Sequence, residues 1–168
     1  MAGRCLGGLG PQPAPGCTKP ANHPPYTCPA PRPSRKETAP GFGFWMGFTG
    51  DDFVGWWILR PPHGPDQPKI EGEAELGYRL LRRHWRQGYA TEGARELIRY
   101  GFEELGLNRI FAQTMAVNTP SRATMASAGM TFARTFSSAE EYEVVLPGTE
   151  HGEVEYAITR RQWQETRG

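Results

Sequence analysis

The sequence of 168 residues has little cysteine and almost no net charge. Its three cysteines, Cys5, Cys17 and Cys28, all precede residue 29, so the rest of the chain holds no disulfide framework. Cysteine-free globular sequence fits a reducing compartment, and we expect a cytoplasmic location. The spacing of Cys17, His23 and Cys28 matches no paired zinc motif, so no metal site is predicted.

Other absences exclude whole classes of partner. No run of residues is long and apolar enough for a transmembrane helix. The first residues also lack the apolar stretch of a signal peptide. The formal net charge is only +1, which gives no electrostatic reason for binding nucleic acid or a membrane surface. We therefore expect neither nucleic acid nor membrane as a partner.

Residues 1–40 contain almost no large apolar side chains, but they contain ten prolines. Such a segment buries too little apolar surface to offset the entropy lost on ordering. We predict a disordered Pro/Gly-rich tail over residues 1–40 and one folded domain over residues 41–168.

Hydrophobic periodicity predicts the elements of that domain. Alternating apolar residues predict a hairpin over 42–59 around the turn residues Thr49 to Asp52. The further predicted elements are a strand over 70–81, a helix over 90–105, a strand over 108–117, a helix from Thr119 to Gly129, strands over 131–136 and 154–159, and a short turn over 160–164. This order predicts an α/β fold with a mixed, partly antiparallel sheet and helices on its faces.

Two local features refine the prediction. Gly77 interrupts the third strand and suggests a bulge there. Thr119 suits the N-cap of the second helix, and Pro120 suits the first helical position. His63 lies in the Pro-rich loop over 60–69 and is expected to be solvated rather than to face a substrate.

The stretch Glu73 to Gly93, EAELGYRLLRRHWRQGYATEG, joins a predicted strand to a helix through a basic loop. The first turn of a helix has unpaired N–H groups and a positive dipole end, so phosphates bind there readily. Gly88 allows the backbone to approach a ligand closely. The stretch therefore predicts an anion site. Neither a GxxxxGK[ST] nor a strand-GxGxxG pattern is present, which disfavours other classes of phosphate-binding α/β protein.

Four separated motifs resemble the GNAT superfamily of N-acetyltransferases, and more narrowly its ribosomal-protein-alanine acetyltransferase branch. They are GEAELGYRL at 72–80, WRQGYATE at 85–92, NTPS at 118–121 and Gly129-Met130. The resemblance covers about residues 42–163 and implies an acyl-CoA N-acyltransferase fold. That family usually has a strand and two helices before the hairpin. Residues 1–40 do not have the composition to form them, so we expect these elements to be lacking.

The resemblance implies acetyl-CoA as co-substrate. The pyrophosphate is expected on the backbone of the loop and helix start, at Arg86, Gln87, Gly88, Tyr89, Ala90 and Thr91. The pantetheine arm is expected to pair with the main chain of Leu76, Tyr78 and Leu80, and to meet Asn118 and Ser121 at its far end. The side chains of Arg82, Arg83 and Arg86 are expected to add positive charge near the phosphates.

The implied reaction is attack of a primary amine on the thioester. The amine is expected to belong to a protein N-terminus, an antibiotic or a small metabolite. The base is expected to be Glu75 or, failing it, Glu73, although an ordinary solvent-facing glutamate is an equally supported interpretation. A backbone N–H near Leu76 or Gly77 is the expected oxyanion donor.

The acid that protonates the leaving thiolate is not evident from the sequence. Many members of the family use a tyrosine on the second helix, and Met125 takes that position here. Tyr142 and Tyr156 are weak substitutes. The alternative function is therefore a catalytically weak or truncated CoA-binding module without efficient turnover. A monomer or a homodimer is expected.

Overall fold

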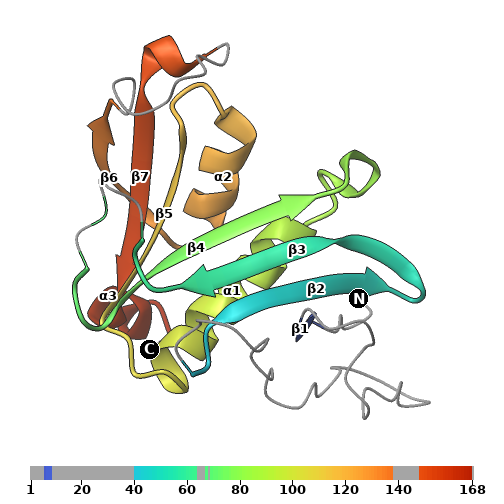
Figure 1. Ribbon diagram of the computed structural model, residues 1–168, viewed down its shortest axis with the longest axis horizontal. Coiled ribbons are helices and arrows are strands. Elements are labelled where there is room, and N and C mark those ends of the chain that lie inside the picture. Colours follow the sequence, from blue (N-terminus) through green and yellow to red (C-terminus); the bar gives the residue numbers. More distant parts are fainter. Residues whose placement is uncertain (1–5, 9–39, 64–66, 68, 138–147, 168) are drawn as a thin grey trace.

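The structure is a computed structural model, which describes residues 6–8, 40–63, 67, 69–137 and 148–167 (Figure 1). Its elements in chain order are β1 (Leu6–Gly8), β2 (Gly43–Thr49), β3 (Asp52–Arg60), β4 (Glu73–Leu80), η1 (Arg82–His84), α1 (Tyr89–Glu103), β5 (Arg109–Met115), α2 (Thr119–Ser127), β6 (Thr131–Phe136), η2 (Thr149–His151), β7 (Glu153–Thr159) and α3 (Arg160–Glu165). Each strand and helix predicted after residue 41 is present, with ends shifted by a few residues at most.

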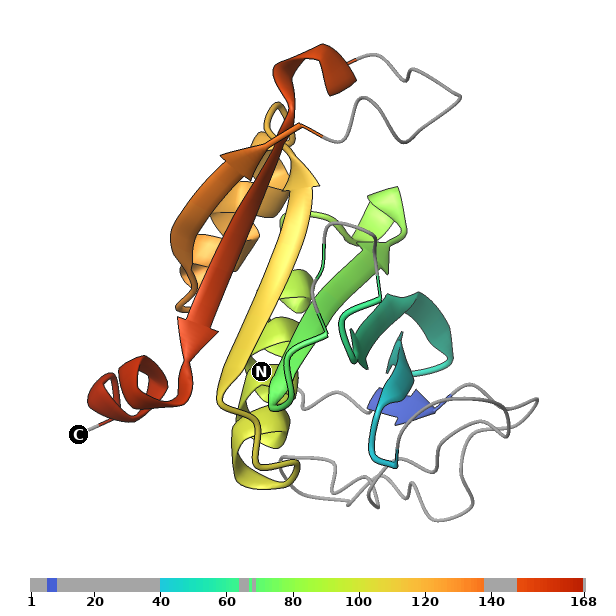
Figure 2. The same cartoon turned by 60° about the vertical axis from the view of Figure 1, so that its left-hand side comes forward.

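Seven strands form one mixed sheet in the order β1-β2-β3-β4-β5-β7-β6 (Figures 1 and 2). Strands β4 and β5 run parallel, while every other neighbouring pair is antiparallel. A parallel pair needs a long crossover, and α1 provides it between β4 and β5. This arrangement confirms the predicted α/β fold with a mixed sheet.

The first strand differs from the sequence prediction. Residues Leu6–Gly8 pair antiparallel with β2, with Leu6 opposite Gly47, although they belong to the segment predicted to be disordered. The prediction is therefore wrong for these three residues. The rest of that segment up to residue 39 lies outside the described residues, and so do all three cysteines. The prediction that the family's first strand and helices are lacking concerns this same segment.

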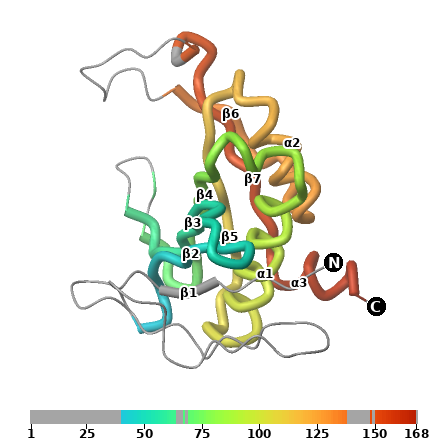
Figure 3. The backbone as a smooth tube through the Cα atoms, turned by 90° about the vertical axis from the view of Figure 1, so that its right-hand side faces the viewer, coloured from blue at the N-terminus to red at the C-terminus, as the bar shows by residue number. Residues whose placement is uncertain are grey.

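The core lies between the sheet and the helices. Side chains of β3 and β4 alternate, so that Trp57, Leu59, Ala74 and Leu76 are buried on the face that α1 covers. Apolar residues of α1 complete this layer: Ala94, Leu97, Ile98 and Phe102. Figure 3 shows α1 and α2 on the same side of the sheet.

Trp57 joins three elements within this core. Its side chain is 2% exposed, and its Nε1 donates a hydrogen bond to the carbonyl of Ala90 at 3.2 Å. A Cβ atom placed on Gly47 of β2 or on Gly93 of α1 would overlap the indole ring. Both glycines therefore make the room that lets the ring lie between β2, β3 and the first turns of α1.

Two local predictions are wrong. Gly77 marks no bulge, because β3 and β4 keep one register from Gly55–Leu80 to Arg60–Glu75. The glycine instead makes room for its cross-strand neighbour, since a Cβ would lie 2.9 Å from Ile58 Cγ2. The N-cap of α2 is Asn118 rather than Thr119, because its side chain accepts from the backbone of Ser121 at 3.3 Å.

None of the helices in the described ranges has both the length and the apolar character that crossing a membrane would require.

Substituting Gly93 by alanine is expected to destabilise the fold, because the added methyl group meets the rigid indole of Trp57. Overpacking of this kind costs about 1–3 kcal/mol and lowers the melting temperature by several degrees. Gly101→Ala is the matched control in the same helix, where the added methyl meets the flexible ends of the Ile110, Leu107 and Leu59 side chains. Thermal unfolding of both variants checks this. An equal or smaller loss at Gly93 would contradict the role given to Trp57.

Candidate functional site

Strands β4 and β5 pair only over a short stretch. The ladder holds Glu73 opposite Arg109, Ala74 opposite Ile110 and Glu75 opposite Phe111, and it ends there. Beyond it the two strands diverge, as Figures 1 and 2 show. Residues 76–80 of β4 then pair with β3 alone, and residues 112–115 of β5 pair with β7 alone. We call this divergence the fork; along it, no strand of the described residues pairs with one main-chain edge of β4.

The chain leaves the open end of the fork through a short loop and enters α1. Gly88 is the N-cap of α1 with φ of 85°, and no side chain caps the helix. The backbone N–H groups at the start of a helix generally have no acceptor within the helix, whereas the N–H of Glu92 donates to the carbonyl of Gly88 at 3.0 Å. A Cβ on Gly88 would meet nothing within 4 Å, so the space beside this helix start is open. This arrangement suits an anion.

Arg86 is the one non-glycine residue with positive φ in the described ranges, at 59°. This left-handed conformation costs free energy for a residue with a Cβ, and residues held in it tend to lie at functional sites. It turns the loop backbone two residues before Gly88.

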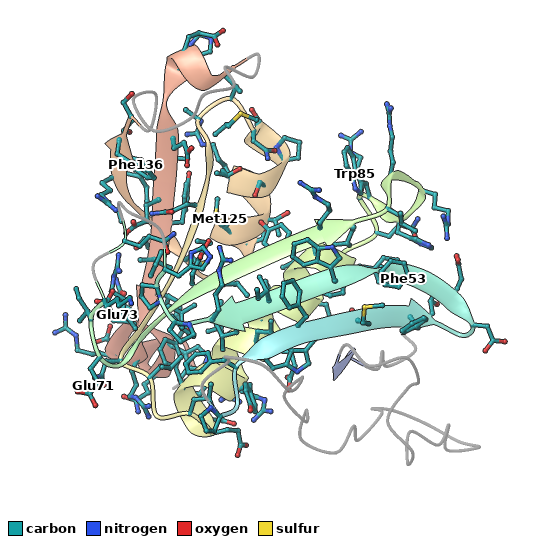
Figure 4. All side chains as sticks on the ribbon, viewed as in Figure 1. Phe53, Glu71, Glu73, Trp85, Met125 and Phe136 are labelled. Carbon is teal, nitrogen blue, oxygen red and sulfur yellow. The ribbon has the colours of Figure 1, made fainter. Side chains whose placement is uncertain are left out.

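Side chains of the loop fix its conformation. The indole of Trp85 donates to the carbonyl of Leu80 at 2.9 Å, and the amide of Gln87 donates to the carbonyl of Arg83 at 2.9 Å. His84 is buried edge-on against Tyr89, with ring centroids 5.8 Å apart. Figure 4 shows Trp85 beyond the open end of β4. The carbonyl of Leu80, predicted to meet the pantetheine arm, is therefore already bonded within the protein.

The β2–β3 turn holds the same loop from the other side. Asp52 accepts a hydrogen bond from Arg83 at 2.6 Å, and His84 Nε2 lies 3.0 Å from its second carboxylate oxygen, outside hydrogen-bond geometry. The hydrogen bond from Arg83 is the largest cause that holds the pKa of Asp52 below its usual value. Of the three arginines predicted near the phosphates, Arg83 is thus directed to Asp52, while Arg82 and Arg86 are exposed.

The start of α2 lies across the fork from β4. Asn118 caps this helix and also donates to the hydroxyl of Thr114 at 3.0 Å. The Oγ of Ser121 lies 3.0 Å from the phenol oxygen of Tyr78, which comes from β4. The structure therefore brings Asn118, Ser121 and Tyr78 to the fork, although their side chains also bond to one another or to their own elements.

The two predicted bases lie at the closed end of the fork and are both ion-paired. Glu75 is at the last paired position and binds Arg60 at 2.7 Å, with 14% of its side chain exposed. Glu73 lies two residues further into the paired region, where Figure 4 labels it, and binds Arg109 at 2.9 Å. The interpretation of ordinary solvent-facing glutamates is therefore wrong. Glu75 lies where β4 and β5 begin to diverge, and this position favours Glu75 over Glu73 as the candidate base.

A polar network extends from Glu75 over the sheet face opposite α1. Its members, in order of contact, are Arg60, His63, Gln67, Gln113, Glu155, and then both Arg109 and Arg134. His63 is exposed as predicted, yet it accepts a hydrogen bond from Arg60 at 3.2 Å when Nε2 is unprotonated. Gln113 and Glu155 were not among the residues predicted for the site. The sequence signal that could have identified them is that each is a polar residue next to the apolar residues of a largely buried strand.

Glu155 is the most deeply buried carboxylate of this network, with 4% of the residue exposed. Burial alone would raise its pKa, but hydrogen bonds from Arg109, Arg134 and Gln113 outweigh burial and hold the pKa below its usual value. Arg109 is paired in turn with both Glu73 and Glu155, and its pKa is raised because these bonds outweigh its own burial. The charges on this face thus compensate one another.

Met125, which the resemblance puts at the position of the family's usual acid, carries an apolar side chain on α2. Met125 is 1% exposed within the core, and Figure 4 shows it on α2. Tyr156 lies on β7 and packs edge-on against Phe132, with ring centroids 5.9 Å apart. Tyr142 lies outside the described residues.

The family model for the acetyltransferase (GNAT) domain matches residues 25–131. The chain therefore belongs to the GNAT superfamily of acetyltransferases. The match begins inside the segment predicted to be a tail. Among named relatives, the chain is 48% identical to FsC-acetyl coenzyme A-N(2)-transacetylase of Aspergillus fumigatus over 128 residues. These aligned residues make up 75% of this chain and 54% of the relative. The chain thus spans about half the length of that relative.

Other similar proteins agree with this assignment. Putative ribosomal N-acetyltransferase YdaF of Bacillus subtilis is 32% identical over 102 residues, which are 61% of this chain and 52% of the relative. A GNAT acetyltransferase structure from Bacillus anthracis aligns with a TM-score of 0.56 and 26% identity, covering 70% of this chain and 66% of that chain. Aminoglycoside acetyltransferase AAC(6')-Ib in complex with coenzyme A aligns with a TM-score of 0.61 and 15% identity, covering 76% and 71%. The predicted acyltransferase fold is confirmed.

The buried position of Glu155 predicts a defined response to acid. Its pKa is depressed in the folded state, so its stabilisation is present above the unfolded pKa of about 4.3 and is lost as pH falls below that value. Glu155→Gln is expected to lower the free energy of unfolding at pH 7 by about 1–3 kcal/mol. When the pH then falls from 6 to 3, the free energy of unfolding should decrease less in the variant than in the unmodified protein. Urea unfolding across that pH range checks this. Parallel pH profiles for the two proteins would contradict it.

Proposed function

We propose that this protein transfers the acetyl group of acetyl-CoA to a primary amine. The observation that carries the proposal is the continuity of two features along one stretch of chain. Within the part of the chain that the structure describes, the fork leaves one edge of β4 without a strand, and the loop that follows leads directly to the N-terminus of α1, where Gly88 offers no capping side chain. An extended arm that ends in a pyrophosphate fits such a pair of sites.

The donor is held by main chain more than by side chains. The pantetheine arm pairs with the main chain of β4 at Leu76 and Tyr78 and extends to Leu80. The carbonyl of Leu80 already accepts a hydrogen bond from the indole of Trp85. The pyrophosphate lies on the backbone N–H groups of Arg86, Gln87, Gly88, Tyr89, Ala90 and Thr91, beside open space. The exposed guanidinium groups of Arg82 and Arg86 add attraction to the phosphates.

Glu75 serves as the base, directly or through water. It lies where β4 and β5 begin to diverge, so an acceptor amine that meets the thioester at this point lies near its carboxylate. Arg60 and the network behind it hold the carboxylate in place. The backbone N–H of Leu76 or Gly77 is the donor to the oxyanion that forms on the thioester carbonyl.

The named relatives suggest acceptors to test. The name of the fungal relative specifies an N(2) acceptor position on a compound designated FsC, and we take an amine of that kind as the first acceptor. Aminoglycosides are the next, following the name of the structure that holds coenzyme A. Protein N-termini follow as well, since the name of YdaF gives a ribosomal N-acetyltransferase and ribosomal proteins carry such amines. The alternative function is a CoA-binding module with little turnover, which the buried Met125 favours. A cytoplasmic location and a monomeric or dimeric state stay predictions.

Acetyl-CoA and an amine panel separate the two functions. Acetyl-CoA should raise the melting temperature, because a ligand that binds only the folded state stabilises it by mass action. Release of free thiol from acetyl-CoA should then depend on one of the amines, namely the FsC compound, an N-terminal peptide or an aminoglycoside. A thermal shift without thiol release from any amine would support the module instead.

Replacing Gly88 by glutamate should abolish acetyl-CoA binding, because the carboxylate occupies the space of the pyrophosphate and repels it. Gly106→Glu is the matched control. Gly106 is an exposed glycine with positive φ at the opposite end of α1, so the control carries the same charge and similar backbone strain. Isothermal titration should show no binding for the first variant and unchanged affinity for the second. Unchanged affinity in the Gly88 variant would remove the phosphate site from this loop.

Replacing Glu75 by glutamine should lower kcat by about 100-fold or more while the affinity for acetyl-CoA stays within threefold. Glu71→Gln is the control, since Glu71 is an exposed carboxylate just before β4. Steady-state kinetics together with titration of acetyl-CoA check both. A large loss in Glu73→Gln, with Glu75→Gln fully active, would move the role of base to Glu73.

A further inference from the structure

The departing thiolate of the proposed reaction needs a proton, and α2 carries no tyrosine to supply it. Met125 has no exchangeable proton and is buried in the core. A phenol donor must therefore come from another element that borders the fork. Among the tyrosines of the described residues, Tyr78 alone lies on the part of β4 that has no β5 partner.

The side chain of Tyr78 extends from β4 to α2. Tyr78 lies opposite Trp57 in the β3–β4 ladder, so it points to the sheet face that the helices cover. Its hydroxyl lies 3.1 Å from the carbonyl of Ser121 and 3.0 Å from the Ser121 Oγ. The phenol thus connects the two sides of the fork, the region where the pantetheine arm is placed under the proposed function.

We propose that Tyr78 is the general acid that protonates the coenzyme A thiolate. This assignment rests on the proposed acetyl transfer. The amine nitrogen forms a bond to the thioester carbon and gives up one proton to Glu75. The C–S bond breaks with its electron pair on sulfur, and the phenol proton passes to that sulfur to give the free thiol. Solvent then takes the proton from Glu75 and returns one to the Tyr78 phenolate.

The surroundings of Tyr78 suit this role. Burial raises the pKa of its hydroxyl, while hydrogen bonds with Ser121 and Thr124 act in the opposite direction, so the phenol keeps its proton at neutral pH. The hydroxyl of Ser121 is free to rotate, and it can donate to the phenolate oxygen once the proton has left. Ser121 is thereby a positioning residue for Tyr78.

The other described tyrosines have different positions. Tyr100 donates to the carbonyl of Gly41 at 3.1 Å, beside the start of β2. Tyr89 packs against His84 in the loop. Tyr156 is on β7 and serves as the matched control, because a phenylalanine there keeps the ring that packs against Phe132 and removes only the hydroxyl.

Tyr78→Phe is the first test, with acetyl-CoA and an amine that the unmodified protein acetylates. We expect kcat to fall by about 100-fold, the dissociation constant for acetyl-CoA to change by less than threefold, and Tyr156→Phe to retain full turnover. Turnover of Tyr78→Phe within threefold of the unmodified protein would overturn the assignment while leaving the proposed function intact. An unmodified protein that binds acetyl-CoA but acetylates no amine would overturn both.

A second variant separates proton donation from a structural contact. Incorporating difluorotyrosine at position 78 makes the phenol more acidic and preserves its shape. Turnover should persist, and the loss of kcat at high pH should begin at a lower pH than in the unmodified protein. A high-pH limb that does not move would assign the hydroxyl a structural role and overturn the proposal.

Discussion

The whole architecture depends on one close contact, the indole of Trp57 between Gly47 and Gly93. This contact sets the distance of α1 from the sheet, because no side chain separates the helix from the ring. The hydrogen bond from Trp57 to Ala90 places that constraint in the first turn of α1. The start of the helix, which is also the proposed phosphate site, is therefore fixed by the core and not by the exposed loop alone.

The fork follows from the same part of the molecule. Helix α1 crosses over between β4 and β5, which makes them parallel, and their ladder ends after three residue pairs. One side of the fork continues into the loop and α1, while the other continues into α2. The donor site, the proposed base and the proposed acid thus all come from segments that adjoin a single short parallel ladder.

Local signals were sufficient for the strands and helices after residue 41, including the helix start at Gly88. Gly88 and the helix that follows it could be predicted because a helix start and its cap are neighbours in sequence. The roles of Trp57 and Glu155 could not, since their contacts join residues far apart: Gln113 and Glu155, for example, meet from strands 42 positions apart. Thr119 was predicted as the N-cap of α2 in place of Asn118, because an asparagine and a threonine both suit an N-cap and only the backbone geometry decides between them.

The polar network on the sheet face opposite α1 also affects how an acceptor amine approaches. Glu73, Glu75 and Glu155 are each bound to a guanidinium group, from Arg60, Arg109 or Arg134. Compensated charges produce little field beyond the surface, so a cationic amine gains little long-range attraction to this face. Its association rate should then depend weakly on ionic strength, and selection among amines falls to contacts made after arrival.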